Sequence, residues 1–184
     1  MAAMIVNRLT LALGRSEQFG LVYSELVVDG RPLRELLSLE PRDEILDHAN
    51  RGPAGENVAV LVHNWPMAGA GGARVLLGEE TSELADGRVP LYVCPVCGDL
   101  GCGAVSALVE RSASHVIWRD FGWEVGWDDG EEEIRFVGGP FVFDRRQYDA
   151  ELREFVDTYD HQRARAPVRE ASPRPPRRRW PWHR

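Results

Sequence analysis

Apolar positions along this chain recur mostly with the short spacing of β-strands. Residues 4–13 and 21–29 alternate partly between apolar and polar side chains, and 57–64 is a continuous apolar run of strand length. Residues 104–111 and 115–123 flank a three-residue connection, a spacing typical of a β-hairpin. In chain order the predicted strands are 4–13, 21–29, 57–64, 73–78, 88–94, 104–111, 115–123 and 133–143. The last is expected to bend at its two adjacent glycines.

Helical spacing is clearest near the C-terminus. Asp144 is a good N-cap for a helix over 145–160, because its side chain can accept a hydrogen bond from a free backbone N–H of the first turn. The apolar face of this helix is formed by Tyr148, Leu152, Phe155, Val156 and Tyr159. Two shorter helices are predicted at 31–37 and 38–53, and the glycine-rich stretch 66–73 is expected to be a flexible loop.

This order of elements predicts an α+β fold. The strands come in hairpins and are not separated by long helices, so we expect a largely antiparallel sheet with a C-terminal amphipathic helix docked at its end. Residues 1–162 are predicted to form a single globular domain. Residues 163–184 contain five prolines and no hydrophobic period, which predicts a disordered basic tail.

Charge is divided unevenly along the chain. Residues 1–162 carry 14 Arg and 28 acidic residues, while 163–184 carry 8 Arg and one Glu, and the chain contains no Lys. An acidic body makes a nucleic-acid partner unlikely for the domain, because duplex binding needs a basic surface. The tail, which mixes Arg with Trp, is expected to make only weak contacts with anionic surfaces.

The expected location is the cytoplasm. No apolar run approaches the roughly 18 residues that a membrane span needs, and we do not expect the first residues to act as a signal peptide, because Asn7, Arg8 and Thr10 interrupt their apolar stretch. Thiols stay reduced in the cytoplasm, so a cysteine cluster there serves metal or redox chemistry more often than a structural disulfide.

All three cysteines lie in one short stretch, 92–103, which reads YVCPVCGDLGCG. Cys94 and Cys97 form a C-P-x-C-G pattern, typical of a zinc knuckle, in which the glycine lets the backbone turn its amides toward the sulfurs. Cys102 follows within one further turn and adds a third sulfur. The spacing predicts a structural zinc site on these three thiolates.

A tetrahedral zinc ion needs a fourth ligand. His115, at the start of the predicted strand 115–123, is the first choice, which gives the predicted ligand set Cys94, Cys97, Cys102 and His115. The alternatives are His63, His48 and Asp99.

Two other interpretations of the cysteine stretch remain open. Three small side chains in a glycine-rich turn can be sulfhydryls that pack as small hydrophobes. Alternatively, Cys94 and Cys97 are redox-active thiols, with Cys102 resolving the mixed disulfide. A thioredoxin-like arrangement is disfavoured, because the residues after Cys97 begin a helix poorly.

Residues 91–124, with the motif CPxCGDxGCG, resemble an uncharacterised bacterial family found mainly in actinobacteria. The resemblance covers about a fifth of the chain and implies no activity. It marks a set of residues as one motif: Cys94, Cys97, Gly98, Asp99, Gly101, Cys102, Trp118 and Phe121.

Two features suggest a surface for a protein partner. Trp118, Phe121, Trp123 and Trp127 lie close together in the sequence, and the run 128–133 carries five carboxylates. The alternative is that some of these aromatic side chains belong to the core and the rest border a surface. Strand alternation places Trp118 on the opposite face from Phe121. We therefore predict a small cytoplasmic binding protein with a zinc knuckle, suited to basic partners including toxins. The alternative is a thiol-dependent oxidoreductase.

Overall fold

Ten strands and two α-helices make up the described part of the chain. The structure is a computed structural model, and it describes residues 5–39, 53–65, 70–125 and 134–168. The strands are β1 (Leu9–Ser16), β2 (Leu21–Val28), β3 (Arg31–Pro32), β4 (Ser38–Leu39), β5 (Val58–Ala59), β6 (Arg88–Val93), β7 (Ala104–Arg111), β8 (His115–Glu124), β9 (Ile134–Val137) and β10 (Phe141–Asp144). The α-helices are α1 (Gly71–Leu77) and α2 (Arg145–Arg165), and short 3-10 helices cover Leu33–Glu35 (η1), Ala85–Gly87 (η3) and Leu100–Cys102 (η4).

The strands form two antiparallel sheets, which backbone hydrogen bonds connect. One sheet has the order β1-β2-β3, the other the order β4-β9-β8-β7-β6-β5, with β10 also paired to β8. Ser24 of β2 donates its backbone N–H to Leu61 over 2.8 Å, which links β2 to the chain just after β5. At the other end, Asn7 donates to the carbonyl of Val142 over 2.6 Å. The contact at Asn7 is an isolated parallel bridge, whereas the ladders between the named strands are antiparallel. The described strands and helices confirm the predicted α+β fold with a largely antiparallel sheet.

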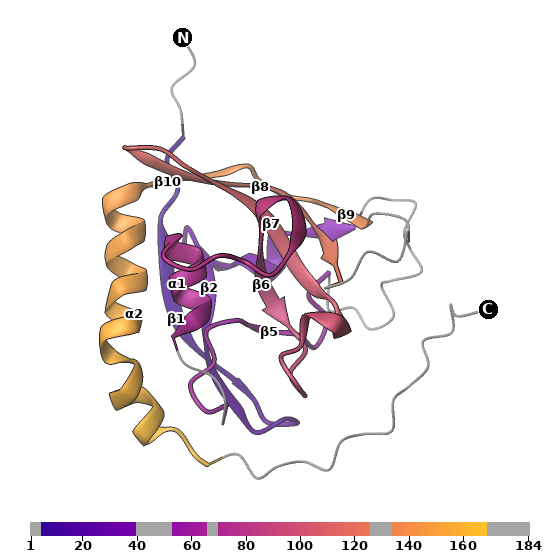
Figure 1. Cartoon of the computed structure of the whole chain (residues 1–184), viewed down its shortest axis with the longest axis vertical. Helices are drawn as coiled ribbons and strands as arrows, with labels where there is room; N and C mark the ends of the chain where they lie inside the picture. The colour runs from indigo at the N-terminus through magenta and orange to yellow at the C-terminus, as the bar shows by residue number, and fades with distance from the viewer. Residues whose placement is uncertain (1–4, 40–52, 66–69, 126–133, 169–184) are drawn as a thin grey trace, which may run out of the picture.

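Helix α2 begins and packs as its sequence predicts. The Asp144 carboxylate accepts a hydrogen bond from the backbone N–H of Gln147 over 3.0 Å, as an N-cap does. The helix runs beside β1 (Figure 1), and its Glu151 side chain accepts the Leu11 N–H over 2.7 Å. Tyr148, Leu152, Phe155 and Tyr159 are buried, and Val156 is half-buried. Side chains of α2 therefore satisfy part of the open edge of β1.

Aromatic rings fill the core between α2 and the sheet. Trp118 of β8 is fully buried and packs edge-on against Phe143 and Tyr148. The Tyr148 hydroxyl donates to the Leu76 carbonyl of α1 over 3.0 Å and accepts from the Trp118 indole over 3.3 Å. Helices α1 and α2 are thus joined through one buried tyrosine, whose polar group is satisfied.

The prediction of a strand at 73–78 was wrong, because these residues lie in α1 and its cap. The Arg111 side chain of β7 donates to the Val75 carbonyl over 3.1 Å and also to the Leu76 carbonyl. Gly78 closes the helix in the left-handed conformation, with φ of 76°. An apolar run this short shows no clear period, and its helical state depends on a distant arginine.

Three other segments differ in detail from the prediction. Within 57–64 only Val58–Ala59 is a strand of its own, and the residues after it pair with β2. In place of the single bent strand predicted at 133–143, β9 and β10 are two separate strands that pair with opposite ends of β8. A 3-10 helix stands where a helix over 31–37 was predicted, and most of 38–53 lies outside the described residues.

A β-bulge overturns the predicted alternation in β8. Ser106 pairs with Gly122 but Leu108 pairs with Arg119, so Asp120 and its successor face a single residue of β7. Asp120 adopts the left-handed conformation with φ of 53°. The extra residue brings Trp118 and Phe121 to the buried side together, both fully buried.

Helix α2 continues to Arg165, three residues past 162, the last residue of the predicted domain. The rest of the predicted tail from 169 onward and the acidic run 128–133 fall outside the described residues. None of the helices in the described ranges has the length and apolarity that a membrane crossing requires.

Candidate metal centre

The cysteine knuckle connects two neighbouring antiparallel strands. Cys94 follows β6 directly, and β7 begins two residues after Cys102. The chain turns when the Gly98 N–H donates to the Cys94 carbonyl over 2.9 Å, with Gly98 at φ of 68°. Asp99 then caps η4 by accepting the Gly101 N–H over 2.7 Å. The glycine therefore serves the turn as predicted.

The turn brings the three sulfurs together. The Sγ atoms of Cys94, Cys97 and Cys102 all lie within 4.8 Å of one another, and those of Cys97 and Cys102 are 3.4 Å apart. All three are free thiols; Cys94 is half-buried and the other two are exposed. Tetrahedral zinc with Zn–S bonds of about 2.3 Å separates its sulfurs by roughly 3.8 Å. The three sulfurs are thus close enough to bind one metal ion.

The surroundings of the sulfurs favour protonated thiols in the metal-free protein. Burial raises the pKa of Cys97, although a hydrogen bond from the Asp99 backbone acts in the opposite direction. Burial also raises the pKa of Cys102 to about 12, with further contributions from its hydrogen bond to Cys97 and repulsion by the neighbouring sulfurs. A divalent cation would reverse this balance, because it compensates several thiolates at once.

Two tryptophans pack against the glycines of the knuckle. A Cβ atom on Gly98 would lie 2.6 Å from the Trp65 ring, and one on Gly103 would lie 2.2 Å from the Trp123 ring. Both distances are too short for any side chain larger than hydrogen. The indole rings therefore fix the path of the chain on either side of Cys102, and they explain why glycine stands at both positions.

Replacing Gly103 with alanine is expected to lower the free energy of unfolding by about 2 kcal/mol. The residue has φ of 87° and ψ of 153°, a region that glycine alone tolerates, and the new methyl group would also displace Trp123. Urea denaturation measures the change. The matched control is Gly20→Ala, at φ of 61° with open space around it, which should cost roughly 1 kcal/mol. Equal losses in both variants would contradict the packing argument.

The structure places His115 away from the three sulfurs. It opens β8 beside the hairpin turn, whereas Cys102 precedes the opposite end of β7. Its Nδ1 atom lies 2.8 Å from the Ser114 hydroxyl. Among the described residues, the group that could hold a metal ion contains only the three cysteines. His115 is close to the cysteines in the sequence, but β7 lies between them. His115 therefore lies at the end of the hairpin that is farther from the cysteines.

The other predicted ligands have different surroundings. His63 is buried, its Nε2 atom lies 3.0 Å from the Ser24 hydroxyl, and its ring packs on Phe155. Burial lowers the pKa of His63, so the imidazole is neutral at physiological pH. The Asp99 side chain caps η4 as described above. His48 lies outside the described residues.

The predicted aromatic surface is mostly core. Trp118 and Phe121 are fully buried, and Trp123 is half-buried against Gly103. Trp127 lies outside the described residues. The β8 bulge is the reason, because it turns Phe121 inward. Sequence reasoning missed Trp65. No local sequence pattern reveals that its ring contacts the knuckle.

Comparisons of the chain with protein-family models, with curated proteins and with solved structures found no match.

Proposed function

We propose that this protein is a small cytoplasmic binding protein whose knuckle holds one zinc ion as a structural element. The observation that supports the proposal is the convergence of the Cys94, Cys97 and Cys102 sulfurs within 4.8 Å at the end of two paired strands. Thiolates are soft ligands, and a compact set of thiolates at knuckle spacing suits zinc better than hard cations such as magnesium or calcium.

The surroundings of the sulfurs support a structural role for the metal. The knuckle is braced by Trp65 and Trp123 and by the backbone hydrogen bonds that follow Cys94. Three thiolates would occupy three tetrahedral positions, and a closed structural site would take its fourth protein ligand from outside the cysteine cluster. An ion held there would clamp the connection between β6 and β7.

A thiol oxidoreductase is the second candidate, and one observation favours it. Cys97 and Cys102 are exposed and their sulfurs are 3.4 Å apart, so an oxidant could remove two electrons and two protons and leave a disulfide between them. The raised pKa of Cys102 argues against it, because the thiolate is the reactive form. The most favourable pair differs from the expected Cys94 and Cys97.

Metal analysis of protein purified without chelator tests the proposal. We expect one zinc per chain, and replacement by cobalt should produce thiolate charge-transfer bands and the intense visible bands of a tetrahedral site. Cys97→Ser should abolish stoichiometric binding. A metal content far below one per chain, together with a reversible Cys97–Cys102 disulfide in mass spectrometry, would overturn the zinc proposal and support the oxidoreductase.

A further inference from the structure

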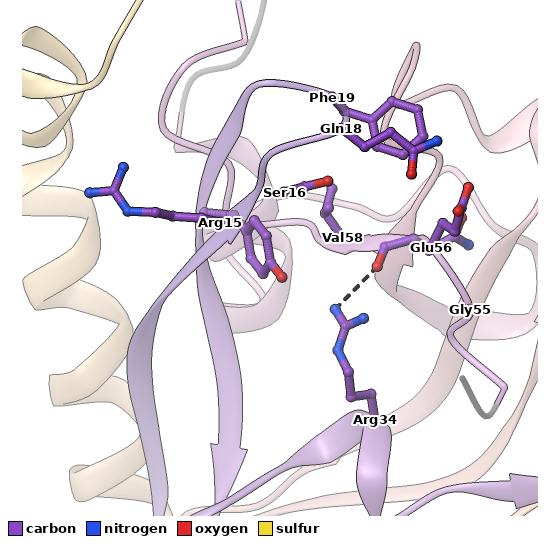
Figure 2. A pocket seen from close by; sticks show the side chains of 10 residues that line it. Arg15, Ser16, Gln18, Phe19, Arg34, Gly55, Glu56 and Val58 are labelled. Atoms are coloured by element: carbon purple, nitrogen blue, oxygen red, sulfur yellow. Dashed lines mark hydrogen bonds between the residues drawn. The ribbon is translucent and has the colours of Figure 1, made fainter. Parts of the chain in front are cut away.

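A cavity of about 340 Å³ lies apart from the cysteine knuckle, and none of the three cysteines lines it. Figure 2 shows its walls. Phe19 and Gln18 come from the turn between β1 and β2, Gly55 from the segment before β5, Val58 from the start of β5, and Arg34 from η1. The volume falls at the lower end of the range of roughly 300–1,000 Å³ for small-molecule sites. The cavity can therefore accept a small ligand.

The Arg34 guanidinium is held in place before any ligand arrives. Its Nε atom donates to Glu25 over 2.8 Å, and its Nη2 atom donates to the Asn57 carbonyl over 3.1 Å, the contact drawn in Figure 2. The Tyr92 hydroxyl donates to the second Glu25 oxygen over 2.7 Å, and the guanidinium lies 4.8 Å above the Tyr92 ring centre. Because Glu25 and Tyr92 are buried, this support is rigid.

Two further donors line the same cavity. Tyr23 is only 8% exposed, and its phenol is the first of them. The Asn57 side-chain nitrogen is buried and has no acceptor among the described residues. Burial raises the pKa of Tyr23, so its hydroxyl keeps its proton and remains a donor. A buried donor without an acceptor, as at Asn57, is costly unless a ligand satisfies it.

The donor set therefore selects an acceptor-rich ligand. A guanidinium, a phenol and an amide N–H₂ group all offer hydrogens, and an oxyanion accepts several such bonds at once. Arg15 also lines the cavity and adds positive charge, and Figure 2 shows it directed away from Arg34. The carboxylate of Glu56 opposes an anion, but it is exposed to solvent and so is screened by water.

We propose that this cavity is a binding site for a small oxyanion, a carboxylate or a phosphate, held by Arg34, Tyr23 and Asn57. The Phe19 ring provides an apolar wall for the body of the ligand. The site is independent of the metal proposed at the knuckle. It would make this protein a carrier or sensor of a small acidic metabolite.

Titration of the full chain with sodium benzoate, benzamide and inorganic phosphate tests this site. Two-dimensional ¹H–¹⁵N NMR should show saturable shifts at Gly55 and Val58 with an oxyanion but not with benzamide, which has the shape of benzoate without its charge. Saturation by benzoate alone assigns a carboxylate ligand, and saturation by phosphate alone assigns a phosphate. No saturable shift with either anion overturns the proposal.

Tyr23→Phe is the variant that isolates the site. It removes one hydroxyl and keeps the ring that packs on Gly14, so the fold should survive. The dissociation constant should rise about tenfold, the usual effect of a lost hydrogen bond to a charged group. The control Arg119→Gln removes an exposed positive charge that does not line the cavity, and Cys97→Ser removes the proposed zinc; both should bind as the parent does. Unchanged affinity in Tyr23→Phe, or an equal loss in Arg119→Gln, contradicts the assignment.

Discussion

Cys102→Ser is expected to weaken zinc binding by about two to three orders of magnitude. A structural zinc ion contributes roughly 10–16 kcal/mol in small domains, so one thiolate ligand accounts for roughly a quarter of that. The Cys102 sulfur is one of three that lie within 4.8 Å, and serine replaces it with a harder, shorter ligand. Competition with a chromophoric chelator at constant pH measures the affinity.

His115→Ala is the matched test of the fourth ligand. His115 lies beside the hairpin turn and contacts Ser114, so its removal should leave the zinc affinity unchanged. A loss comparable to that of Cys102→Ser would show that His115 reaches the ion after all. If both variants bind zinc as the parent does, the three cysteines are not a metal site, and the cavity proposed for an oxyanion is unaffected.

Arg88→Met is expected to lower the free energy of unfolding by about 2–3 kcal/mol. The Arg88 side chain is only 5% exposed and pairs with Asp120 over 2.9 Å and with Glu124 over 2.8 Å. Removing one member of a buried ion pair typically costs about 3–5 kcal/mol, because the remaining charge loses its partner. Here both carboxylates are partly accessible and Arg135 also pairs with them, which reduces the loss.

Arg119→Met provides the control on the same hairpin. Arg119 pairs with Glu110, and both side chains are about half exposed. Exposed pairs contribute little, so the free energy of unfolding should change by less than about 0.5 kcal/mol. Urea denaturation compares the two variants directly. A similar loss of unfolding free energy in both variants, or no loss in Arg88→Met, would show that the burial of Arg88 does not determine how strongly its ion pairs stabilise the fold.

The sequence predicted those elements whose signals are local. Asp144 caps α2 through a neighbouring N–H, and the strands on either side of the 112–114 connection pair as a hairpin. The convergence of Cys94, Cys97 and Cys102 also follows from a short turn. In each case the stabilising contacts lie within a few residues, so the pattern in the sequence is sufficient.

Elements that depend on distant contacts were not predictable. The bulge at Asp120 adds one residue to β8, and a single inserted residue reverses the face of every side chain beyond it. Helix α1 needs Arg111, which lies more than 30 residues away in the sequence. The cavity at Arg34 is formed by three segments that only the tertiary fold brings together, so no motif marks it.

The capping of α1 by Arg111 also constrains the order of folding. A helix of seven residues is too short to be stable alone in water. The unfavourable free energy of helix nucleation exceeds the stabilisation that so few hydrogen bonds provide. Its last carbonyls are satisfied from β7, and Tyr148 of α2 binds the Leu76 carbonyl. We therefore infer that α1 becomes helical only after the hairpin of β7 and β8 exists. The late folding of this segment would also place it among the first to open in native-state hydrogen exchange.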